Sequence, residues 1–112
     1  MYMSYTKLFI YDNLFNTDLI NKICSKNKII DGYIFIKNYD NVNNIITLAT
    51  TKDIKSKLHV GKIVEFQMDL ENIIKNMITY HLVSENYEVE KIYADTFKYG
   101  VQNVYIIINI KE

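Results

Sequence analysis

The sequence contains no arginine, no proline and no tryptophan, and it has one cysteine and three glycines among its 112 residues. Without arginine, the chain lacks the planar group that binds phosphates and carboxylates through two parallel hydrogen bonds, so only lysine supplies a fixed positive charge. The single cysteine, Cys24, excludes a disulfide within the chain and a cysteine-based metal cluster. Because Cys24 falls on the apolar stripe of a predicted helix, we interpret it as a small core hydrophobe rather than a reactive thiol.

Neither charge sign is in excess, because the 13 lysines are matched by 13 acidic residues. A nucleic-acid-binding protein normally carries a basic excess and uses arginine to read bases, so the composition argues against that class. No apolar run approaches the roughly 18 residues of a membrane span, and no secretory signal pattern opens the sequence. We therefore expect a cytoplasmic protein that binds neither nucleic acid nor membrane.

Isoleucine, asparagine, lysine and tyrosine are abundant, and all four have AT-rich codons. This bias indicates a low-GC bacterium, a virus or a phage. If the protein is viral, the expected location is the cytoplasm of the host. The ten tyrosines are spread along the chain rather than gathered in one stacking platform. The length of 112 residues predicts a single domain, 1–112, with one core.

The stretch 7–14 organises the predicted fold, because an apolar strand ends there at Tyr11 and turns sharply at Asp12-Asn13 before a helix. Free N–H groups at such a turn can bind an anion. Asn16 or Thr17 can cap the first helix, and Asp69 can cap the second. Hydrophobic periodicity predicts strands over 5–11, 29–38, 45–51, 58–68, 87–97 and 101–110, and helices over 17–26 and 70–83.

The order of these elements predicts an α+β domain. The first and last strands are apolar on both faces, which is typical of strands covered on both sides. Only the connection through the first helix suits a parallel crossover, and every later connection indicates antiparallel neighbours. We expect a strongly curved mixed sheet or a small, partly closed barrel of about six strands, with two helices packed outside it.

Three landmarks resemble the gamma-glutamyl cyclotransferase-like family. The family opens with an apolar strand ending in Tyr-Gly-Thr/Ser-Leu, where this sequence has Tyr11-Asp12-Asn13-Leu14. A Gly-Tyr pair and a later Val-x-Gly-type strand entry correspond to Gly32-Tyr33 and Val60-Gly61. A Leu-Asp-x-Tyr-Glu motif at the end of the second helix corresponds to the residues that end in Tyr80-His81, and a tyrosine follows at Tyr87. The resemblance in element order covers nearly the whole chain.

The resemblance implies an enzymatic activity, but this sequence differs from the family's pattern at two positions. In the family, the first turn binds a glutamyl group through main-chain atoms, and the helix-end glutamate is the general acid/base that releases 5-oxoproline. Here the turn glycine is replaced by Asp12, whose carboxylate would repel an anionic glutamyl group, and the glutamate is replaced by His81. His81 is open to three interpretations: a histidine stabilised by the helix dipole, a ligand-binding residue or a catalytic acid/base.

Three functions follow. The first is a small-molecule-binding protein on this scaffold, with the standard activity lost or altered, which sequesters a metabolite or a signalling molecule. The second is an active 5-oxoproline-forming enzyme with His81 as acid/base. The third is a viral or phage interaction protein that acts on a host partner. The predicted ligand-binding residues are Tyr11, Asp12, Asn13, Leu14, Tyr80 and Tyr87.

We predict no cofactor and no metal site. Asp12 and His81 would supply two ligands, fewer than a typical zinc site uses, and His59 has no evident partner in the sequence. A homodimer is compatible with the neutral charge and the isoleucine-rich last strand.

Overall fold

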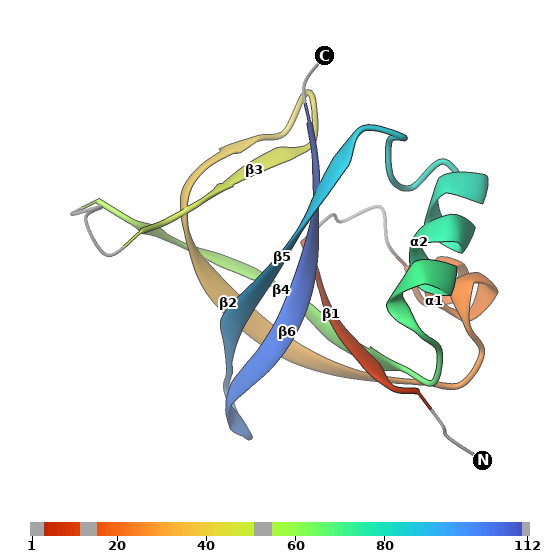
Figure 1. The fold of residues 1–112 in the computed structure, drawn as a ribbon. Coiled ribbons are helices and arrows are strands. Elements are labelled where there is room, and N and C mark those ends of the chain that lie inside the picture. The colour runs from red at the N-terminus through yellow and green to blue at the C-terminus, as the bar shows by residue number, and fades with distance from the viewer. Residues whose placement is uncertain (1–3, 12–15, 51–54, 111–112) are drawn as a thin grey trace.

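In a computed structural model, which describes residues 4–11, 16–50 and 55–110, the elements follow the predicted order. The strands are β1 (Thr6–Ile10), β2 (Asn27–Asp40), β3 (Ile45–Leu48), β4 (Lys57–Phe66), β5 (Tyr87–Thr96) and β6 (Gly100–Asn109), and the helices are α1 (Thr17–Ile23) and α2 (Leu70–Thr79). Both helices lie on one side of the strands (Figure 1). The predicted α+β class is confirmed.

Five strands close into a barrel, in the order β2-β4-β1-β6-β5. The barrel closes where Gly32 and Tyr33 of β2 pair with the end of β5. The pair β1–β6 is parallel, whereas the other barrel pairs are antiparallel. The short strand β3 extends the sheet by pairing with the last part of β2. The structure therefore confirms the predicted mixed sheet and its closure.

Two connections differ from the prediction of antiparallel neighbours. The prediction is correct for the hairpins β2–β3 and β5–β6. It is wrong for β3–β4 and β4–β5, because β4 lies along one edge of β2 while β3 and β5 share its other edge. The physical reason is the length of β2, whose 14 residues give it room for three partners.

The single core predicted from the length is divided into two, because alternate side chains of the strands point into the barrel or towards the helices. The barrel core contains Phe9, Tyr11, Ile34, Ile36, Ile46, Ile63, Ala94, Val104 and Ile106. The helix-side core contains Leu8, Ile10, Ile20, Ile23, Val64, Phe66, Ile73, Ile74, Met77, Val83 and Ile107. Because β1 supplies buried residues to both cores, it is covered on both faces, as its sequence predicts.

Gly32 and Gly61 face each other across β2 and β4. A Cβ atom on Gly61 would lie 2.5 Å from the carbonyl oxygen of Ile10, and one on Gly32 would lie 2.9 Å from that of Asp95. The glycines therefore allow strands to approach each other more closely than any side chain would permit. A glycine inside a strand indicates either a bulge or a close approach, and the structure shows the close approach.

Helix α1 begins as its sequence predicts but ends early. The Asn16 side-chain oxygen accepts a hydrogen bond from the Leu19 N–H at 2.9 Å, which caps the first turn. The helix stops at Ile23 instead of near residue 26, because Cys24 adopts an extended conformation as its C-cap. The Cys24 carbonyl then accepts a hydrogen bond from the Asn27 side chain at 2.8 Å, where β2 begins. Cys24 is partly buried against the helix-side core, as predicted.

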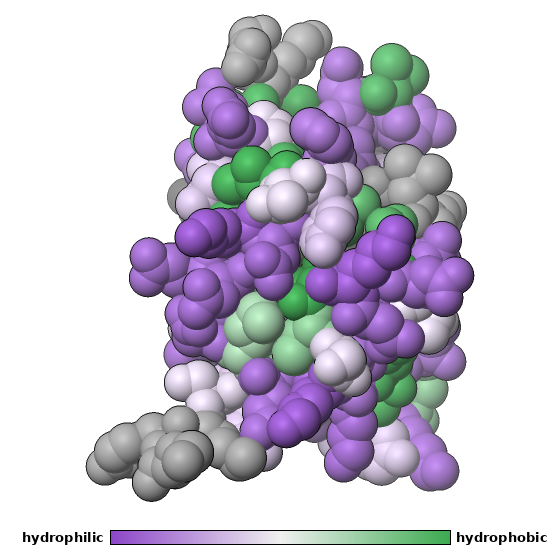
Figure 2. All heavy atoms as spheres, turned by 90° about the vertical axis from the view of Figure 1, so that its right-hand side faces the viewer, coloured by the Kyte–Doolittle hydropathy of each residue, from purple (hydrophilic) through white to green (hydrophobic). Residues whose placement is uncertain are grey.

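The face of the molecule that carries the helices is mainly hydrophilic, with small apolar patches between polar and charged side chains (Figure 2). Within the residues described here, no helix is long and apolar enough to cross a membrane.

Candidate functional site

Helix α2 stops at Thr79, four residues before its predicted end near residue 83. The His81 N–H donates to the Ile78 carbonyl at 3.0 Å, and the Leu82 N–H donates to the Met77 carbonyl at 2.8 Å. These two bonds form a Schellman turn, which ends a helix with one residue in the left-handed conformation. His81 occupies that position with a φ of 58°.

The helical periodicity predicted up to residue 83 would place His81 on the apolar face of α2, and this placement is wrong because the helix ends before His81. The Schellman turn reverses the chain, so that His81 is exposed while Leu82 and Val83 fold back against the helix-side core. A histidine costs free energy at this position because its Cβ atom crowds the backbone, whereas glycine has no Cβ atom.

Replacing His81 with glycine should stabilise the protein by about 1 kcal/mol, because glycine adopts the left-handed conformation without steric cost. His81→Ala is the matched control, since alanine removes the imidazole but keeps the backbone strain. Urea unfolding followed by circular dichroism would measure both variants. A His81→Gly variant no more stable than His81→Ala would contradict the assignment of strain.

A cavity of about 910 Å³ opens beside this turn, between the α2–β5 connection and the β2–β3 turn. Its volume is typical of small-molecule sites, which span roughly 300–1,000 Å³. The polar side chains that line it are Tyr39, Asn41, Asn44, His81, Ser84, Glu85 and Asn109. Hydroxyl, amide and imidazole groups thus dominate the polar lining, and among the described lining residues Glu85 supplies the one carboxylate and no lysine takes part.

Asn44 joins three elements at the base of this cavity. Its carbonyl oxygen accepts hydrogen bonds from the Tyr11 hydroxyl at 3.3 Å and from the Asn109 side chain at 3.4 Å. Its side-chain oxygen accepts a hydrogen bond from the Tyr39 hydroxyl at 2.9 Å. Asn44 has a φ of 55°, which asparagine tolerates better than most residues. These contacts fix the β2–β3 turn relative to β6 and to the end of β1.

Tyr11, Tyr39 and His59 form an aromatic cluster at the same end of the barrel. The His59 ring centroid lies 4.9 Å from that of Tyr39 and 6.2 Å from that of Tyr11. The His59 Nε2 atom lies 3.4 Å from the Tyr11 carbonyl oxygen. Because Tyr39 also lines the cavity, the cluster supports the cavity from inside the barrel.

The structure brings together some of the predicted site residues and separates others. Tyr11 and His81 reach the same end of the barrel, since Tyr11 bonds to Asn44 and His81 lines the cavity with Asn44. Tyr80, in contrast, is the exposed C-cap of α2, and Tyr87 packs against the helix-side core. Neither tyrosine belongs to the lining of the cavity.

The predicted turn residues Asp12, Asn13 and Leu14 lie outside the described residues and stay predictions. The described part of the chain contains no group of three or more His, Cys, Asp or Glu side chains arranged to hold a metal ion. The candidate site therefore consists of the cavity, Asn44 and the aromatic cluster beneath them.

No family model matches the sequence, and no curated protein is detectably similar to it. Solved structures are similar. A protein of Arabidopsis thaliana, known from a solution structure, aligns with a TM-score of 0.63 and 12% identity over 96% of this chain and 70% of its own. A gamma-glutamyl cyclotransferase aligns with a TM-score of 0.62 and 9% identity over 96% of this chain and 68% of its own. The chain therefore has the gamma-glutamyl cyclotransferase-like fold.

Proposed function

We propose that the protein binds a small polar molecule in the cavity beside His81 and that the standard cyclotransferase activity is lost or altered. The observation that carries this proposal is a cavity of about 910 Å³, in which apolar side chains are joined by hydroxyl, amide and imidazole groups. It lies on a scaffold similar to that of a protein named gamma-glutamyl cyclotransferase. Such a protein would sequester a metabolite or a signalling molecule.

The charges of the described lining favour a neutral or cationic ligand. Glu85 attracts positive charge, and no lysine among the described lining residues is available to pair with a carboxylate. Asn44, Asn109 and Ser84 carry amide and hydroxyl groups suited to amides, alcohols and amines. A free glutamyl carboxylate would lose its hydration in this cavity without gaining a lysine partner, which is unfavourable.

The replacement of glutamate by His81 supports the loss of the standard reaction. Imidazole differs from carboxylate in charge and reach, and a misplacement of about 1 Å in a reacting group can lower a rate about 100-fold. An altered cyclotransferase with His81 as acid/base is the second candidate function. In its favour, His81 lines the cavity in a strained backbone conformation, and such strain often occurs at functional sites.

An assay of 5-oxoproline release separates the two candidates. Purified protein would be incubated with several γ-glutamyl amines and γ-glutamyl peptides, in parallel with the His81→Ala and His81→Glu variants. We expect no release by the unmodified protein. Release that disappears in His81→Ala would overturn the binding-only proposal and establish the enzyme.

Ligand binding is tested by thermal shift with a mixture of neutral and cationic polar metabolites. We expect a higher melting temperature, with a smaller increase in Asn109→Ala, which alters the cavity. Asn103→Ala is the matched control, because Asn103 is an exposed asparagine nearer the other end of β6. If no metabolite changes the melting temperature and the protein elutes only with a macromolecule, the binding proposal is wrong and an interaction function gains support.

A further inference from the structure

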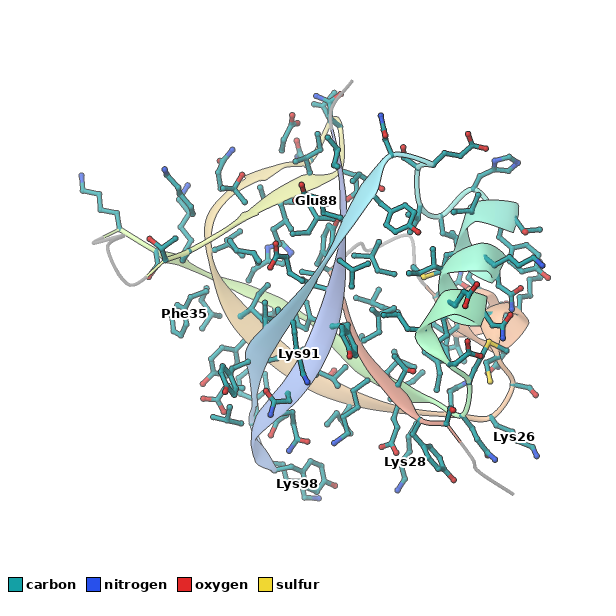
Figure 3. The ribbon with its side chains drawn as sticks, in the orientation of Figure 1. Lys26, Lys28, Phe35, Glu88, Lys91 and Lys98 are labelled. Atoms are coloured by element: carbon teal, nitrogen blue, oxygen red, sulfur yellow. The ribbon has the colours of Figure 1, made fainter. Side chains whose placement is uncertain are left out.

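The barrel has a second open end, opposite the end that carries Asn44 and His81. The register places Thr6 beside Phe66 at this second end, whereas the chain reaches the first end at Tyr11, whose hydroxyl donates to Asn44. Figure 3 shows Lys26, Lys28 and Lys98 at the lower end of the molecule, whereas Glu88 lies near the upper end. A cavity of about 480 Å³ at the lower end is lined by Lys7, Lys28, Ile30, Ile63, Tyr99 and Gln102, together with Ile29 and Glu65.

Two lysines at this cavity retain hydrogen-bonding capacity. Glu65 is the cross-strand partner of both Lys7 and Lys28, yet no ion pair joins it to either lysine in the described chain. The Lys7 Nζ atom donates one hydrogen bond, at 2.8 Å, to the side-chain oxygen of Gln102. Because an ammonium group has three donors, Lys7 and Lys28 can both bind an anion placed between them.

The surroundings of this cavity are electropositive, although the whole chain has a net charge of zero. Two further hollows adjoin the cavity at this end. One shares Lys28 and Glu65 with it, and the other shares Ile29 and Tyr99. The charged residues that line the cavity and the two hollows are Lys7, Lys26, Lys28, Lys62, Lys98, Asp31 and Glu65. Five lysines against two carboxylates leave an excess of three positive charges, which attracts anions.

The cavity also has an apolar side. Ile63 belongs to the barrel core and Ile30 packs against that core, and both line the cavity. The cavity therefore combines cationic groups with an apolar surface, as expected for a ligand that carries both an anionic group and a hydrocarbon chain.

We propose that this end of the barrel is a second binding site, for a small organic anion with an apolar chain. The anionic group, a carboxylate or a phosphate, lies between Lys7 and Lys28, and the chain contacts Ile30. A single-stranded nucleic acid is the competing ligand class, because it too is attracted to lysines and tyrosines. The partly exposed side chain of Ile30, which lines the cavity with both lysines, favours the small molecule.

The test uses the full chain with octanoate and monooctyl phosphate as probes, followed by nuclear magnetic resonance of backbone amides. We expect saturable shifts at residues 28–30 and 63–65 for at least one probe, and none at Asn44. Lys7→Gln and Lys28→Gln should each weaken binding about tenfold, because each removes a charge-assisted hydrogen bond. Lys37→Gln, an exposed lysine on β2 that lines none of these hollows, should leave affinity unchanged.

Glu65→Gln provides a result that misfolding cannot imitate, because removing the negative charge between the lysines should strengthen binding severalfold. Octanamide, the neutral analogue, should bind at least tenfold more weakly than octanoate. The proposal is overturned if neither anion saturates, if octanamide matches octanoate, or if Lys37→Gln weakens binding as much as Lys28→Gln. It is also overturned if a short thymidine oligonucleotide binds this end while neither probe does.

Discussion

Replacing Gly61 with alanine should destabilise the protein by about 3 kcal/mol, because the new methyl group has no space inside the barrel. Its Cβ atom would lie 2.5 Å from the carbonyl oxygen of Ile10 and 2.7 Å from a ring carbon of Phe9. The ring can shift slightly, but the carbonyl belongs to the backbone of β1 and cannot rotate away. Strands β1 and β4 must therefore separate, which disturbs one of the barrel's five pairings. Urea unfolding with linear extrapolation would measure the loss.

Gly100 and Val60 supply the controls for this prediction. A Cβ atom on Gly100 would meet nothing within 4 Å, but the residue has a φ of 76°. Gly100→Ala should therefore cost only about 1 kcal/mol, from backbone strain alone. Val60, the neighbour of Gly61, is 55% exposed, so Val60→Ala should cost less than about 1 kcal/mol. Equal losses in Gly61→Ala and Gly100→Ala would show that close strand approach is unimportant.

Replacing Phe9 with alanine should have the second large effect, a loss of about 4 kcal/mol. Phe9 is 1% exposed and lies inside the barrel core. The substitution removes a ring from a closed barrel whose strands cannot collapse freely, so a cavity remains. Because domains are typically stable by about 5–15 kcal/mol, such a loss would leave a large unfolded fraction at high temperature. The free energy of unfolding and the melting temperature would both report the change.

Phe35 offers a control of the same residue type on the outside of the barrel. Its ring is 54% exposed and meets the Tyr33 ring edge-on at a centroid distance of 6.1 Å. Phe35→Ala should therefore cost about 1 kcal/mol or less. If the Phe35 and Phe9 substitutions have similar effects, the barrel interior is not the principal core.

The sequence predicts the elements well where local residue patterns decide their structure. The apolar character of β1 on both faces predicts its place between two cores, and Asn16 predicts the start of α1. Gly32 inside a strand indicates a bulge or a close approach, and the structure shows a close approach, with Gly61 as the cross-strand partner. The order of the elements predicts a strongly curved or partly closed sheet with two helices outside it, and the structural comparison confirms the gamma-glutamyl cyclotransferase-like fold.

The sequence does not predict features that depend on distant contacts. The periodicity of α2 continues past Thr79, but Leu82 and Val83 reach the core through a Schellman turn rather than through the helix. A strand pattern identifies the faces of β2 but not the partners along its edges, so its three pairings are not evident.

The cavity and its supporting cluster also escape prediction from sequence, because their residues come from separate elements. His59 has no neighbour in the sequence that marks it, since its partners Tyr11 and Tyr39 lie on β1's end and β2. One local pattern does mark Asn44. It is an asparagine immediately before a strand, where a turn residue in the left-handed conformation is common.

The parallel pairing of β1 with β6 determines when the protein can complete its fold. Leu8 and its partner Tyr105 are separated by nearly the whole sequence, so a growing chain releases β1 long before β6 exists. Closing so large a loop is entropically costly, and folds with many such contacts take about milliseconds to seconds to form. Until β6 arrives, the apolar side chains of β1 lack one of their two flanking strands. We therefore expect nascent chains of this protein to aggregate readily or to depend on chaperones during synthesis.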